Sequence, residues 1–97
     1  MDNNHNQYTI QQAINGMLKA YHIDEKLNQV RLISSWEKVM GKSVSNRTTS
    51  LRIKNKILFV QLTSAPLREE LHYAKDKIIQ LLNEEVGEKV IEDVVLK

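Results

Sequence analysis

The sequence predicts an α+β domain of two layers, in which helices pack on a three-stranded sheet. Three observations support this fold class. Two segments with apolar residues at helical spacing come first, and two short segments that alternate apolar and polar residues around a tight turn follow them. One more helical segment then leads into a short apolar strand. The expected order of elements is α-α-β-β-α-β.

The composition is that of one small globular domain. The 97 residues are 41% hydrophobic and 27% charged, which leaves little room for a second core. No apolar run is long enough to span a bilayer, and the first residues lack the basic and apolar regions of a secretory signal. Cysteine is absent, so disulfides and thiolate chemistry are excluded. We expect a cytoplasmic protein that does not bind membranes.

Residues 1–8 are predicted to form a flexible tail and residues 9–97 a single domain. Thr9 is the predicted N-cap of a first helix, with apolar residues at helical spacing over residues 10–21. A short break at residues 21–23 would join this helix to the next as a hairpin or an angled pair.

Asp24 is the predicted N-cap of the second helix, and Gly41 occupies the position where a glycine commonly ends a helix. Its predicted buried stripe consists of Leu27, Val30, Ile33 or Ser34, Trp36 or Glu37, and Met40.

Residues 48–62 predict a β-hairpin with a type I′ turn at Asn55 and Lys56. This turn fixes the register of the two strands. The pairs on the core face are Ile53–Leu58, Leu51–Val60 and Thr49–Leu62. The pairs on the opposite face are Arg52–Phe59, Ser50–Gln61 and Lys54–Ile57.

Ser64 is predicted to begin a third helix, with Pro66 in its first turn and Gly87 at its end. Residues 90–96 are predicted to form a last strand, which a β-helix-β crossover returns alongside the hairpin. Trp36 is expected to anchor the second helix to the sheet rather than to contact a partner. The predicted core residues are Trp36, Leu51, Ile53, Leu58, Val60, Leu62 and Leu71.

No catalytic or metal-binding signature is present in the sequence. It has no glycine-rich phosphate loop, no HExxH motif and no nucleophile elbow. The three histidines, His5, His22 and His72, lie far apart and are interpreted as ordinary surface residues. We therefore expect no enzyme activity, metal, cofactor or small-molecule substrate.

Positive charge is concentrated in residues 42–56, which hold five basic residues and no acid. Such a segment attracts a polyanion. Cations beside an aromatic ring suit the phosphates and bases of a single-stranded nucleic acid. The candidate nucleic-acid-binding residues are Lys42, Arg47, Arg52, Lys54, Lys56 and Phe59.

Two other interpretations of this surface stay open. The chain could be a general module that binds RNA or other single-stranded nucleic acid. Alternatively, the surface could be a protein interface, with the amino-terminal segment or a second chain covering Ile57 and Phe59. Arg68, His72 and Lys75 form a further charged flank at helical spacing. The candidate partner-binding residues are Ile57, Arg68, His72 and Lys75.

Several short motifs follow one another in order along the chain. They are residues 35–41 (SWEKVMG), residues 58–64 (LFVQLTS), Glu70-Leu71, Leu82-Asn83, Gly87 and Val90-Ile91. Together they resemble the DciA-like bacterial family over residues 9–96, where the first motif matches the "W…vG" helix end of the family and the second matches one of its strands. The resemblance implies a KH-like fold and a non-enzymatic factor of DNA replication that binds the replicative helicase and single- or double-stranded DNA, and helps to load the helicase.

The chain also departs from these expectations at three points. It has no GXXG loop, through which KH domains clamp a nucleic-acid backbone. An aromatic residue often found early in the third helix is replaced by Pro66 or Leu67. Many relatives carry flexible extensions, whereas this sequence stops at Lys97, so we expect helicase contact through the domain or the short tail.

Overall fold

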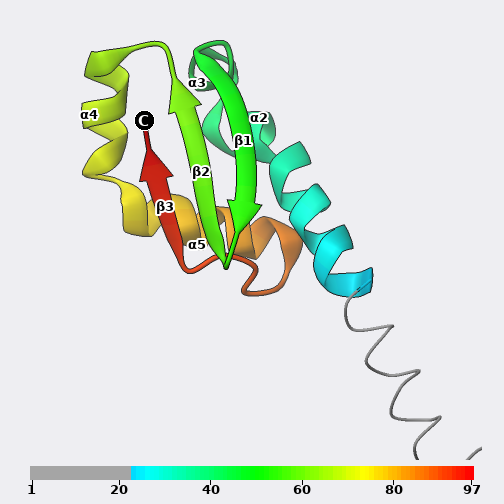
Figure 1. The fold of residues 1–97 in the computed structure, drawn as a ribbon. Helices are drawn as coiled ribbons and strands as arrows, with labels where there is room; N and C mark the ends of the chain where they lie inside the picture. Colours follow the sequence, from blue (N-terminus) through cyan, green and yellow to red (C-terminus); the bar gives the residue numbers. More distant parts are fainter. Residues whose placement is uncertain (1–22) are drawn as a thin grey trace, which may run out of the picture.

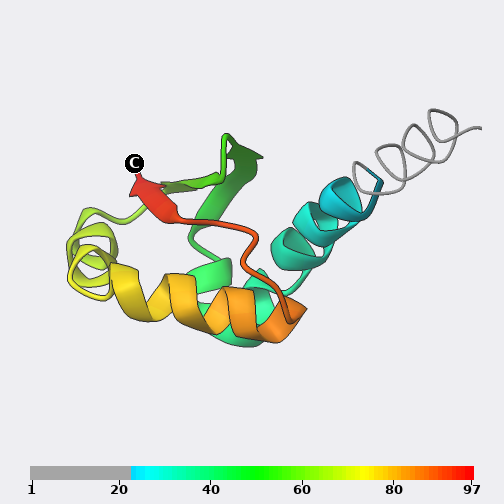
Figure 2. The same ribbon diagram turned by 90° about the horizontal axis from the view of Figure 1, so that it is seen from below.

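The computed structural model describes residues 23–97, so the tail and the first predicted helix lie outside the described residues. The described part has two layers (Figure 1). One layer is a mixed sheet of strand order β1-β2-β3, and the helices pack on one face of it (Figure 2). The predicted α+β class and the three-stranded sheet are confirmed. The element order agrees with the KH-like arrangement that the resemblance implies.

The hairpin formed by β1 (Thr48–Lys54) and β2 (Ile57–Leu62) has the predicted turn. Asn55 and Lys56 have φ angles of 52° and 63°, which is the geometry of a type I′ turn. Five of the six predicted pairs are confirmed, from Lys54 opposite Ile57 to Ser50 opposite Gln61.

The sixth predicted pair is wrong because a bulge at Thr49 shifts the register. Leu62 lies opposite Thr48 instead. The Thr48 hydroxyl donates to Val44 O at 2.8 Å and accepts from Trp36 Nε1 at 3.0 Å. The bulge thus keeps Thr48 turned toward the helices, while the Thr49 hydroxyl donates to Gln61 O on the exposed side.

The second predicted helix is interrupted. Residues 23–34 are helical, a turn follows at Ser35, and α2 (Trp36–Met40) and α3 (Lys42–Ser45) complete the segment. Ile23 is already helical, so the prediction of Asp24 as N-cap is wrong. Gly41, with a φ angle of 90°, ends α2 as predicted, but the sequence did not predict α3.

The buried side chains of this segment differ in part from the predicted stripe. The Ser35 hydroxyl donates to Leu32 O at 2.7 Å. Leu32, before the turn, and Trp36, after it, are almost fully buried. Leu27 and Val30, which belonged to the predicted stripe, are 44% and 60% exposed. Ile33, Trp36 and Met40 are partly or fully buried as predicted, so the stripe holds next to the sheet and fails at the two residues that come earlier in the helix.

The third predicted helix consists of α4 (Ala65–His72) and α5 (Lys75–Val86). The Ser64 hydroxyl accepts from Leu67 N at 3.2 Å, which confirms the predicted N-cap. Gly87 ends α5 in the left-handed conformation, as predicted. The turn at Tyr73 between the two helices was not predicted, and it places Lys75 on a different helix from Arg68.

The last strand, β3 (Asp93–Leu96), is shorter than the predicted 90–96 and pairs parallel to β2. Val90 and Ile91 precede it and are buried without joining the sheet. The Asn83 side chain of α5 fixes the segment that contains Val90 and Ile91. Its Oδ1 accepts from Val90 N and Ile91 N, and its Nδ2 donates to Ile91 O. These bonds replace the ladder that a longer strand would supply.

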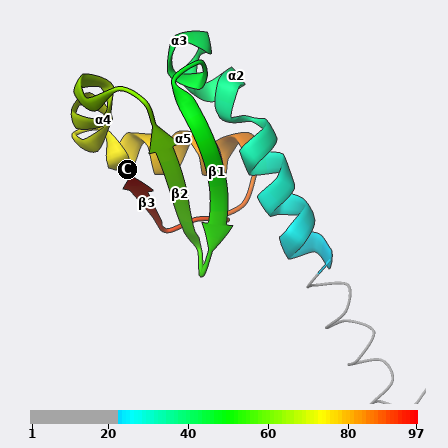
Figure 3. The same ribbon diagram turned by 45° about the horizontal axis from the view of Figure 1, so that its top comes forward.

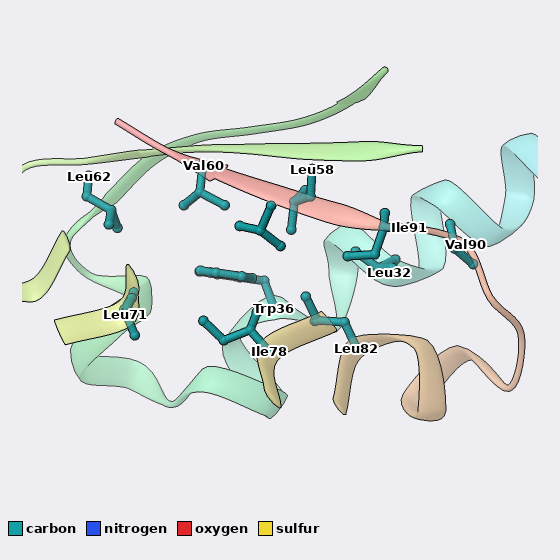
Figure 4. Close-up of a cluster of buried hydrophobic side chains, with 11 residues drawn as sticks. Leu32, Trp36, Leu58, Val60, Leu62, Leu71, Ile78, Leu82, Val90 and Ile91 are labelled. Atoms are coloured by element: carbon teal, nitrogen blue, oxygen red, sulfur yellow. The ribbon is translucent and has the colours of Figure 1, made fainter. Parts of the chain in front are cut away.

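The core lies between the sheet and the helices. Figure 4 shows the ring of Trp36 between the sheet and Ile78 of α5. Leu51 and Ile53 are only half-buried, because β1 is an edge strand. The buried apolar residues are Leu32, Trp36, Leu58, Val60, Leu62, Leu71, Ile78, Leu82, Val90, Ile91 and Val94.

Candidate functional site

The face of the sheet that points away from the core is the candidate site. Within residues 23–97, no helix packs on this face (Figure 2). The side chains of this face form three rows, because strand residues alternate between the two faces and the register aligns them across the strands. Each row runs from β1 through β2 to β3 or to Lys97, which follows β3. The rows of this open face are Lys54–Ile57–Asp93, Arg52–Phe59–Val95 and Ser50–Gln61–Lys97.

Phe59 lies at the centre of the open face between two cations. The guanidinium carbon of Arg52 is 5.0 Å from the centroid of its ring, and Nζ of Lys97 is 5.9 Å from it. Both distances fit cation–π attraction. The ring is half-buried, so part of its surface stays accessible. A shallow hollow beside the ring is lined by Ser50, Arg52, Phe59, Val60, Gln61 and Lys97.

One local turn and one long-range strand pairing bring these groups together. The tight turn at Asn55 and Lys56 sets Arg52 directly opposite Phe59. The parallel pairing of β3 then brings Lys97 to the same ring, since Lys97 N donates to Val60 O at 2.9 Å and Lys97 O accepts from Leu62 N at 2.7 Å.

Lys97 was missing from the residues predicted from the sequence. The signal that could have identified it is the alternation of Asp93, Val95 and Lys97 along the last strand.

Three of the predicted basic residues lie away from the open face. Lys42 belongs to α3, and Arg47 precedes β1, where its Nη1 donates to Ser43 O at 3.1 Å. Lys56 lies in the hairpin turn and lines a hollow with Asp24, Glu25 and other residues. Carboxylates beside Lys56 reduce the local positive potential. Of the predicted cations, the open face therefore holds Arg52 and Lys54.

The predicted partner-binding residues do not form one surface. Arg68 and His72 line one hollow beside Tyr73 and Leu96. Arg68 Nη2 lies 3.4 Å from Leu62 O, and its Nε is buried without a hydrogen-bond partner in the described chain. Lys75 begins α5 beyond the turn and does not line this hollow. Ile57 lies on the open face.

Two kinds of feature are absent from residues 23–97. No group of three or more His, Cys, Asp or Glu side chains there could hold a metal ion. Over the same residues, no helix combines the length and apolar character needed to cross a membrane.

A comparison with protein families matches residues 9–96 to the family model described as "Dna[CI] antecedent, DciA". The match covers nearly the whole chain and confirms the resemblance seen in the sequence motifs. No curated protein and no solved structure matches the chain. The chain therefore belongs to the DciA family, whose members are non-enzymatic loaders of the replicative DNA helicase.

Proposed function

We propose that this chain holds single-stranded DNA on the open face of its sheet while it assists loading of the replicative helicase in the cytoplasm. Family membership implies the interaction with the helicase. The observation that best supports DNA binding is the position of the Phe59 ring between Arg52 and Lys97.

A single strand suits this surface better than a duplex. Unpaired bases expose their π-faces and stack on aromatic side chains, whereas bases inside a duplex do not. Phe59 offers one accessible ring, and Arg52, Lys54 and Lys97 surround it with cations for the phosphates. Asp93 is the one acid in the three rows, so the open face has a net positive charge.

The composition also favours the sheet as the binding surface. The chain has glycine only at positions 16, 41 and 87, so no GXXG loop can form between helices. The motif through which KH domains clamp a nucleic-acid backbone is therefore missing, which favours contacts with DNA through side chains. The open face carries an aromatic ring and cations together.

Charge reversal on the open face tests the proposal. In Arg52→Glu/Lys54→Glu, fluorescence anisotropy with labelled single-stranded DNA at low salt should show a large loss of affinity. Helicase loading on single-stranded DNA should fall in parallel. The matched control is Lys26→Glu/Lys77→Glu, which changes the charge equally at exposed positions in the helical layer and should retain both activities.

Unchanged DNA affinity in the open-face variant, with both variants folded, would refute the open face as the DNA site. An RNA oligonucleotide of equal length and sequence tests the alternative of a general RNA-binding module. Tighter binding of RNA than of DNA, without stimulation of helicase loading, would favour that alternative.

A further inference from the structure

Asp93 is an exposed acid on the surface proposed to hold DNA. It is the first residue of β3 and lies opposite Ile57 of β2 on the open face. Figure 3 shows the start of β3 beside the hairpin turn, at one end of the sheet. A carboxylate repels phosphates, so at a DNA site its favourable contacts are with the N–H groups of the bases.

The fold fixes the position of this carboxylate. Its Oδ1 accepts from Val94 N at 2.8 Å, and Glu92 N donates to Lys56 O at 2.7 Å, which ties the start of β3 to the hairpin turn. Asp93 takes part in neither of the ion pairs found within residues 23–97. An ionised carboxylate has about four acceptor positions, so the bond to Val94 leaves acceptor capacity on both oxygens.

The row Lys54–Ile57–Asp93 has the parts that one nucleotide needs. Ile57 is a half-buried apolar floor with a cation on one side and a carboxylate on the other. Adjacent strands lie about 4.8 Å apart, so the edge of a base lying on Ile57 reaches Asp93 while its phosphate lies at Lys54. Ile57 and Phe59 are two residues apart along β2, about 6.5 Å, so this base is the neighbour of the one stacked on Phe59.

Guanine is the base that suits a carboxylate at this place. In a single strand its Watson–Crick edge is free and presents two adjacent donors, N1–H and the 2-amino group. The N3–H of thymine lies between two carbonyl oxygens, and a ring nitrogen acceptor adjoins the amino group in adenine and cytosine. Those acceptors repel the second carboxylate oxygen. We propose that Asp93 selects guanine at the nucleotide next to the one on Phe59, an inference that rests on the proposed function.

Asp93→Asn separates this role from a structural one. The asparagine keeps an oxygen that can accept from Val94 N, so the start of β3 is preserved. Its amide group replaces the other oxygen with a donor, which opposes the N–H groups of guanine. The variant also loses a negative charge, so its affinity for DNA without guanine should stay equal or rise.

The measurement is fluorescence anisotropy with short thymine oligonucleotides that carry one central guanine or none. The unmodified chain should bind the guanine oligonucleotide at least about fivefold more tightly, the lower limit for a good bidentate pair. Asp93→Asn should lose this preference. Glu92→Gln is the matched control, because it removes the neighbouring exposed carboxylate, which pairs with Lys89, and it should retain the preference. Hypoxanthine in place of guanine lacks the 2-amino group and should weaken binding to the unmodified chain but not to Asp93→Asn.

The thymine oligonucleotide reports on the DNA site without Asp93. If it binds and depends on Arg52 and Phe59, but guanine adds nothing or its preference persists in Asp93→Asn, guanine selection is overturned and the proposed function stands. If neither oligonucleotide binds, both are refuted.

Discussion

The guanidinium carbon of Arg52 lies 5.0 Å from the centroid of the Phe59 ring, across the hairpin on the open face of the sheet. Lys97 approaches the same ring from the end of the chain, with Nζ 5.9 Å from the centroid. A half-buried aromatic ring flanked by two cations is a surface that can stack a base and neutralise the adjoining phosphates. Substitutions at Phe59 and at Arg52 separate base stacking from phosphate neutralisation.

Phe59→Leu should weaken the binding of single-stranded DNA by about 1–3 kcal/mol, the typical contribution of one stacked base. Leucine keeps the site apolar but removes the aromatic surface. The dependence of affinity on salt should not change, because the phosphate contacts remain. Fluorescence anisotropy over a salt series measures both quantities. Tyr73→Leu removes an exposed aromatic ring away from the open face and should bind like the unmodified chain.

Arg52→Gln should reduce the slope of log affinity against log salt by about 1, because one phosphate contact is lost. The weakening should be similar for all DNA sequences, since phosphates carry no sequence information. Arg31→Gln, at an exposed position of the helix over residues 23–34, is the matched control and should leave the slope unchanged. An equal slope in Arg52→Gln and the unmodified chain would exclude this guanidinium from the DNA contact.

Trp36→Ala should lower the free energy of unfolding by about 3–5 kcal/mol, the usual cost of removing a large buried aromatic side chain. Trp36 is 2% exposed, and its Nε1 donates to Thr48 Oγ1 at 3.0 Å. Urea unfolding followed by circular dichroism measures the loss, since the variant has no tryptophan fluorescence. Tyr73→Ala should change the same quantity by less than about 0.5 kcal/mol. An equally stable Trp36→Ala would contradict the placement of this ring in the core.

Asn83→Ala should lower the free energy of unfolding by about 1–3 kcal/mol. Three hydrogen bonds join this side chain to the segment before β3, and their loss leaves the N–H and C=O of Ile91 without partners, while Val90 N keeps its bond to Glu88 O. Asn28 makes an exposed bond from Nδ2 to Glu88 at 2.9 Å, so Asn28→Ala is the matched control and should cost much less. Equal losses in the two variants would argue against a special role for Asn83.

Local patterns were enough to predict the hairpin. Strand alternation has a period of two, so one turn at Asn55 and Lys56 fixes the partners of Arg52 and Leu51. The cap at Ser64 and the helix end at Gly87 were predictable for the same reason, since each depends on a few neighbouring residues.

The features that the sequence did not predict depend on contacts distant along the chain. The bulge at Thr49 accompanies a hydrogen bond between Thr48 and Trp36, twelve residues apart. Lys97 reaches Phe59 only because β3 pairs parallel to β2. The turn at Tyr73 divides a segment whose apolar spacing is continuous, so the spacing alone predicts one helix.

An NMR titration of the isotopically labelled chain with short single-stranded DNA tests the central claim most directly. The amide signals of the open face should shift, above all those of Ser50, Arg52, Phe59, Gln61, Val95 and Lys97. Signals from the helical layer, such as those of Ile78 and Leu82 in α5, should stay in place. Shifts confined to the helices, with the signals of Arg52 and Phe59 unchanged, would contradict the assignment of the open face to DNA.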